Sequence, residues 1–138
     1  MSGKAVRRFW WVLSGSWCMC TLAIVLFPHK AVTEAGPGAS AANGKVLFEK
    51  RCTGCHALDR DKEGPRLRGI YGRKAGSVPD FSYSDELKSS KITWDAGTLD
   101  KWLTNPEVIM PNTDMAFHVS NPQERADIIE FLRVSSGK

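Results

Sequence analysis

The pattern of apolar and polar residues divides this 138-residue chain into three segments. Residues 1–27 are dominated by an apolar stretch that follows a basic start, and residues 28–43 are rich in Ala, Gly and Pro. Residues 44–138 mix apolar and charged positions as a globular domain does. We therefore expect a membrane anchor or signal sequence, then a flexible linker, then one functional domain.

Helical signals recur along the third segment, and no strand pattern persists there. Ser84 can cap a short helix, and Asn121-Pro122 combines a cap with a proline at the first helical position. From that start, apolar residues recur on one helical face. The sequence predicts an all-α domain with helices at residues 43–54, capped by Asn43, at 84–89, at 95–104 and from 121 onward.

The apolar stretch from Phe9 to Phe27 contains no charged residue, and as a helix its 19 residues would span about 28 Å, close to a bilayer core. Basic residues precede it, which predicts that the following domain lies on the outer side of the membrane. The stretch is either an uncleaved anchor or a cleaved signal peptide. The small-x-small cleavage sequence Ala39-Ser40-Ala41 lies far beyond it, which favours the anchor.

The charged residues are distributed unevenly along the chain. The net charge of the chain is +4, but most of the excess precedes residue 42. Residues 42–74 carry nine basic and four acidic side chains, whereas residues 75–138 carry six and ten. The domain is therefore nearly neutral overall but dipolar, and such a dipole can orient a partner. Because there is no basic tail or repeat, we expect no binding to nucleic acid.

The sequence Cys52-Thr53-Gly54-Cys55-His56 carries the clearest chemistry. Two thiols at this spacing lie about one helical turn apart, so each can add to one vinyl group of a haem, and the adjacent imidazole can reach the iron. A thioredoxin-like pair would need a preceding βαβ pattern, and a zinc site would need further Cys or His at suitable spacing. The sequence has neither pattern, so we expect one haem c, covalently bound through Cys52 and Cys55, with His56 on the iron.

The opposite face of a haem iron takes a methionine, a histidine or nothing. Met115 lies in a stretch of turn-forming residues that follows Asn105-Pro106, where an extended loop can present its thioether across from His56. Met110 and His118 lie in the same stretch as rivals, and spacing alone does not separate the three candidates.

Several short sequences outside the haem motif occur in the order typical of one family. They are Gly44–Phe48, Gly64–Gly69, Tyr71–Gly76, Phe81–Ser84, Ile92–Trp94, Asn105-Pro106 and Pro111–Phe117. Over about 95 residues the chain resembles the mitochondrial-type cytochromes c, which are class I c-type cytochromes. The resemblance implies the small class I cytochrome c fold, in which helices wrap around one covalently bound haem.

The resemblance also implies roles for individual residues. Met115 becomes the distal iron ligand, and the Pro65 carbonyl accepts a hydrogen bond from the ring of His56. The residues expected beside one haem propionate are Arg73, Tyr83 and Trp94, and Thr113 is expected beside the other. The first and last helices are expected to meet at Gly44, Phe48, Ile128 and Phe131.

Some positions depart from the family pattern. Trp102 stands near the Met115 sulfur where the family usually has a tyrosine, and an indole donates a hydrogen bond but cannot accept one. Glu107 and Asp114 stand where the family has lysines around the exposed haem edge. The residues that would keep part of this basic ring are Arg51, Lys62, Arg73 and Lys74.

From these features we expect a single-electron carrier that is not an enzyme and takes no small-molecule substrate. The expected partners are membrane redox complexes, such as a quinol-oxidising complex as donor and a terminal oxidase as acceptor. The expected location is the periplasmic side of a bacterial inner membrane, with attachment through residues 9–27 if residues 1–27 are retained. A haem peroxidase or a ligand sensor is the alternative if the Met115 position opens.

Overall fold

The computed structural model of the chain describes residues 38–138. Within this range the helices are α1 (Ala41–Arg51), α2 (Asp85–Ser89), α3 (Ala96–Thr104), α4 (Pro106–Ile109) and α5 (Pro122–Ser135). The same range contains no strand, and an isolated antiparallel bridge pairs Lys74 with Thr93. The expected all-α class is confirmed.

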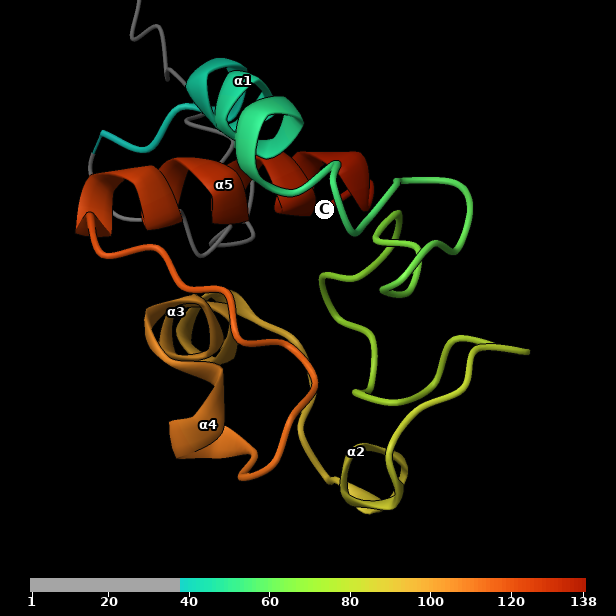
Figure 1. Cartoon of the computed structure of the whole chain (residues 1–138). Coiled ribbons are helices and arrows are strands. Elements are labelled where there is room, and N and C mark those ends of the chain that lie inside the picture. Colours follow the sequence, from blue (N-terminus) through green and yellow to red (C-terminus); the bar gives the residue numbers. More distant parts are fainter. Residues whose placement is uncertain (1–37) are drawn as a thin grey trace, which may run out of the picture. The chain divides into compact units, whose positions relative to one another are not determined.

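The first and last helices cross closely, and α3 contacts both α5 and α4 (Figure 1). A Cβ atom on Gly44 of α1 would lie only 1.9 Å from the carbonyl oxygen of Asp127 on α5, so a side chain at this position would push the helices apart. Next to this crossing, the ring centroids of Phe48 and Phe131 are 5.3 Å apart. The expected contact between the first and last helices is confirmed.

The start of α1 differs from the expectation. Its N-cap is Ser40 and not Asn43, because the Ser40 hydroxyl accepts a hydrogen bond of 3.2 Å from the backbone N–H of Asn43. The backbone N–H of Ser40 also donates to the Asp127 carboxylate over 2.8 Å. This tertiary contact with α5 favours Ser40 over a local alternative that is an equally good cap. The helix ends at Arg51 and not near Gly54, since the chain turns at Cys52.

Two caps organise the region of α3 and α4. The carboxylate of Asp95 accepts from the Thr98 N–H, and the Thr98 hydroxyl accepts from the Asp95 N–H, each over 2.8 Å, which makes a reciprocal capping box. Asn105 ends α3 as expected, but it also caps the one-turn helix α4, which the sequence pattern did not predict. Its side chain accepts from the Glu107 N–H over 3.1 Å, and Pro106 suits the first helical position.

The other two helix starts agree with the sequence. Ser84 caps α2, and Asn121 caps α5 by accepting from the backbone N–H groups of Gln123 and Glu124. Asn121 thus satisfies two of the N–H groups that a helix start leaves without partners. The apolar face of α5 is buried in the core through Ile128, Ile129 and Leu132.

No helix within residues 38–138 is long and apolar enough to cross a membrane. The proposed anchor or signal sequence at residues 1–27 lies outside the described residues, as does most of the proposed linker at 28–43. Both remain predictions from the sequence.

Candidate functional site

A cavity of about 410 Å³ opens among the helices and the long loops that connect them. Its wall is mostly apolar and includes Phe48, Leu67, Ile70, Phe81, Leu99, Leu103, Ile128 and Leu132. A cavity of this volume and character is typical of a site for one bound molecule. The ten site residues chosen from the sequence all line it: Cys52, Cys55, His56, Pro65, Arg73, Tyr83, Trp94, Trp102, Thr113 and Met115.

The two thiols of the cavity come from the turn that follows α1. The backbone N–H groups of Cys55 and His56 donate to the carbonyl of Cys52 over 3.1 and 2.8 Å, which closes a tight turn. Burial raises the pKa of Cys52 to about 11, and a hydrogen bond with Glu63 raises the pKa of the exposed Cys55. Both shifts favour the neutral thiol over the thiolate.

The ring of His56 is held in one orientation. Its Nδ1 lies 2.8 Å from the carbonyl oxygen of Pro65, which accepts a hydrogen bond when Nδ1 carries the proton. Nε2 then keeps the lone pair that a metal ligand needs. A Cβ atom on Gly64 would lie 2.2 Å from Cε1 of this ring, so the ring occupies space that only glycine leaves open. Burial lowers the pKa of His56, which favours the neutral imidazole that binds metals.

The three rivals for the second axial position occupy different environments. Met115 is half-buried and lines the cavity. Met110 is buried in the hydrophobic core and does not line the cavity, and His118 is exposed and does not line it either. The indole N–H of Trp102 donates to the sulfur of Met115 over 3.1 Å. The thioether therefore has a fixed partner within the site, as the His56 ring does.

Polar groups gather in another part of the cavity lining. Arg73 donates to the backbone carbonyls of Arg66 and Arg68 over 2.9 and 3.0 Å, and burial lowers the pKa of its guanidinium. Burial also raises the pKa of Tyr83. A half-buried cation beside a neutral phenol is a suitable environment for a carboxylate of a bound molecule.

Some features of the site were not foreseen. The apolar wall could not be separated from other core positions by sequence pattern, and no sequence signal pointed to the contact between Glu63 and Cys55. Lys62 was expected in an exposed basic ring, but it donates to the carbonyls of Thr53 and Gly54 and so supports the attachment turn.

These residues fit a haem c. The cavity brings together a pair of thiols, an oriented imidazole, a thioether and an apolar wall, with a cation suited to a propionate. The fit is also steric, because the glycine at position 64 leaves room for the imidazole beside the cavity.

Comparisons with known proteins agree with this geometry. The profile of the cytochrome c family matches residues 41–136. A cytochrome c2 from Rhodomicrobium vannielii is 45% identical over 99 residues, which cover 69% of this chain and 78% of that protein. A cytochrome c from Sesamum indicum is 38% identical over 104 residues, which cover 72% and 93% of the two chains. The structure of cytochrome cH from Methylobacterium extorquens matches with a TM-score of 0.66 and 38% identity, and the match covers 70% of this chain and 99% of that one.

Proposed function

Since this chain belongs to the cytochrome c family, we propose that it carries single electrons with His56 and Met115 as the axial ligands of its iron. One haem c is bound covalently through Cys52 and Cys55, and the chain is an electron carrier of the class I type. When bound, the haem supplies an iron that changes its charge by one electron.

The observation that carries the proposal is that the two candidate ligands line one cavity and each has one fixed partner. His56 is oriented by the carbonyl of Pro65, and Met115 by the indole of Trp102. A ligand set held in this way changes little between two oxidation states, which favours fast electron transfer. A neutral thioether and burial of the site both favour the reduced state.

Other residues exclude water from the site or are proposed to bind the charged propionates of the haem. Trp94 and Trp102 are buried, and their rings meet edge to face with centroids 5.2 Å apart. Arg73, Tyr83 and Trp94 are proposed to hold one propionate and Thr113 the other. Cys55 is exposed at the cavity. Electrons would therefore enter and leave at the haem edge that is bonded to Cys52 and Cys55.

The proposed partners are redox proteins of a membrane, with a quinol-oxidising complex as donor and a terminal oxidase as acceptor. The basic start and long apolar stretch of residues 1–27 support attachment on the periplasmic side of a bacterial inner membrane. If this segment is retained, it raises the effective concentration of the carrier near its partners. The exposed acids Glu107 and Asp114 place negative charge where the family has lysines, which changes the partner surface that would fit.

A redox titration of the purified holo-protein tests the proposal. We expect a single reversible one-electron transition, with one spectrum for each oxidation state and only a small shift when common haem ligands are added. A transition that is irreversible, or that shifts strongly with added ligand, would contradict the proposed His56 and Met115 ligation.

A further inference from the structure

The segment that carries Met115 has few contacts of its own. Between Met110 and Val119 most side chains are exposed, and the exceptions are the half-buried Thr113 and Met115. The Met115 backbone N–H donates to the Thr113 hydroxyl at 3.3 Å, a contact within the segment that does not tie it to the rest of the domain. We call residues 111–118 the methionine loop. Apart from the bond from the Trp102 indole to the Met115 sulfur, the position of the loop depends on how its two ends are held.

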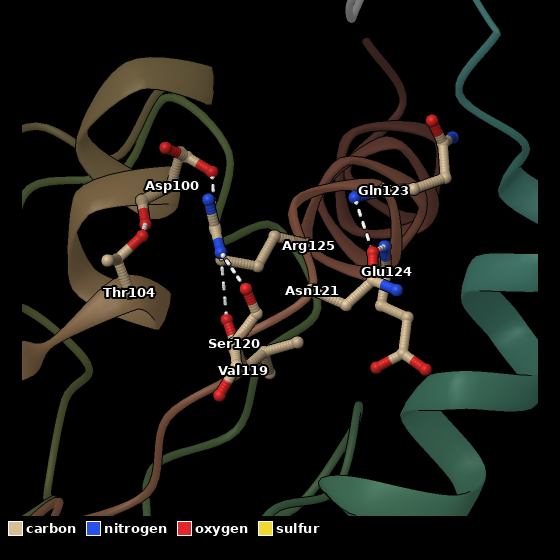
Figure 2. Close-up of polar contacts among 8 residues, drawn as sticks. All are labelled: Asp100, Thr104, Val119, Ser120, Asn121, Gln123, Glu124 and Arg125. Carbon is tan, nitrogen blue, oxygen red and sulfur yellow. Dashed lines mark hydrogen bonds and ion pairs between the residues drawn. The ribbon is translucent and has the colours of Figure 1, made fainter.

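The end of the loop is held by an arginine on α5. The Nε of Arg125 donates to the Asp100 carboxylate of α3 over 2.7 Å. Its Nη1 donates to the carbonyls of Val119 and Ser120 over 2.9 and 3.1 Å. Figure 2 shows the Arg125 side chain reaching toward Asp100, with both carbonyls beside its guanidinium. One side chain thus joins α3, α5 and the chain segment that leaves the methionine loop.

The Arg125 side chain and the chain segment that it contacts are largely buried. Its side chain is only 11% exposed, and its partner Asp100 is 47% exposed. Val119 is fully buried, and its backbone N–H donates to the carbonyl of Leu103 over 2.7 Å. Leu103 and Trp102 are neighbours on α3, so the same helix that presents the indole to Met115 also receives the end of the loop.

We propose that Arg125 is a positioning residue that keeps the methionine loop closed and so keeps Met115 on the iron. The inference rests on the proposed ligation by Met115. When the arginine is lost, the carbonyls of Val119 and Ser120 lose their donor. The end of the loop then loses its link to α5 and keeps the bond from the Val119 N–H to Leu103 of α3. An external ligand then competes with Met115: the bond from sulfur to iron breaks, a bond from the new ligand to iron forms, and no electron or proton is transferred.

Binding of imidazole to the oxidised holo-protein tests this inference. Arg125→Gln removes the positive charge and the several N–H donors of the guanidinium. Because the open state of the loop is then more populated, we expect the variant to bind imidazole on the order of tenfold more tightly than the wild type. The matched control is Glu130→Gln, which breaks the partly buried pair of Glu130 with Arg133 on the same helix, away from the loop. This control should bind imidazole as weakly as the wild type does.

Hydrogen exchange separates local opening of the loop from a general loss of stability. In Arg125→Gln the amide of Val119 should lose protection while the amides of the α1 and α5 crossing keep theirs. Asp100→Asn leaves both carbonyl contacts in place and should raise the affinity less. If Arg125→Gln does not yield folded protein, Asp100→Asn is measured in its place. An imidazole affinity of Asp100→Asn equal to that of Glu130→Gln would then overturn the inference.

The outcomes distinguish this inference from the proposed function. If the wild type itself binds imidazole readily and shows no thioether ligation, the proposed axial role of Met115 fails. If the wild type is closed and Arg125→Gln is equally closed, the ligation stands and the role of Arg125 is refuted.

Discussion

The indole N–H of Trp102 donates to the sulfur of Met115 over 3.1 Å. Trp102 is buried at 8% exposure and lies on α3, whereas Met115 belongs to a loop whose other side chains are mostly exposed. The family usually has a tyrosine at this position, which can both donate and accept, but an indole can only donate. The sulfur therefore receives a hydrogen bond that cannot reverse its direction.

This contact predicts the effect of Trp102→Phe on the reduction potential. A donor to the sulfur withdraws electron density from the thioether, which disfavours the oxidised iron. Phenylalanine keeps an aromatic ring but removes the donor, so we expect the potential to fall by roughly 20–60 mV, which corresponds to the net free energy of one hydrogen bond for a one-electron couple. Tyr71→Phe is the control, because Tyr71 does not line the cavity. A potential that is unchanged or raised in Trp102→Phe would show that the bond does not act on the iron.

The glycine next to the His56 ring gives a second prediction. In Gly64→Ala the new methyl group would lie 2.2 Å from Cε1 of His56, so the ring or the backbone must move. Overpacking of this kind costs on the order of 1–3 kcal/mol, and denaturant unfolding of the holo-protein would measure it. The control is Gly97→Ala in α3, where the nearest contact of the methyl group is 3.6 Å away. Equal stability of the two variants would mean that the ring position is not constrained.

The helix signals that the sequence predicted correctly are local ones. Asn121-Pro122 contains its own cap and its own first-turn proline, and Ser84 caps a helix of a single short turn. The cap of α1 could not be chosen in this way, because Ser40 is selected by a bond to Asp127, 87 residues further along the chain. Likewise, α4 escaped prediction because Asn105 ends one helix and starts another.

The candidate site likewise has a part that local sequence signals predict and a part that depends on folding. The thiols and the imidazole follow from one contiguous motif, and the family resemblance of the short motifs pointed to the polar residues and Met115 but not to the apolar wall. Spacing could not separate Met115 from Met110 and His118, because they differ only in where folding places them. A long-range contact such as the one from Arg125 to Asp100 leaves no sequence pattern at all.

The capping box of α3 predicts a pH-dependent contribution to stability. The backbone N–H of Thr98, and after it the Thr98 hydroxyl, lowers the pKa of Asp95 below the ordinary 3.8. This stabilisation is present above the pKa of the unfolded chain and is lost as the pH falls through the lower pKa of the folded state. Asp95→Asn keeps a capping side chain but loses the charge at the helix start, which we expect to cost about 0.5 kcal/mol at pH 7.

The measurement is denaturant unfolding of the wild type and Asp95→Asn at pH 7 and near pH 3. The difference in free energy of unfolding between the two proteins should shrink at the lower pH. A difference of the same size at both pH values would exclude a role for the ionised carboxylate.

The acid at position 114 predicts how the reduced protein reacts with charged electron acceptors. Asp114 is exposed at the cavity, so its charge acts on a molecule that approaches the site. Asp114→Lys should oxidise several-fold faster with anionic ferricyanide at low ionic strength, and slower with a cationic acceptor, because the approach is steered by charge. High salt should remove both effects.

The control for this prediction is Glu49→Lys, which changes the net charge by the same amount on α1, outside the lining of the cavity. If both variants change the rates equally, net charge alone is responsible and the region around Asp114 has no special part in docking.

The proposed electron-carrier role depends on Met115 closing the sixth coordination position of the haem iron. Carbon monoxide added to the reduced holo-protein at neutral pH tests it most directly, with Met115→Ala as a variant whose position is open. We expect the absorption spectrum of the wild type to stay unchanged, while that of the variant shifts promptly to the spectrum of a carbonyl complex. A prompt carbonyl spectrum in the wild type would contradict ligation of the iron by Met115 and would favour a ligand-binding or peroxidase role.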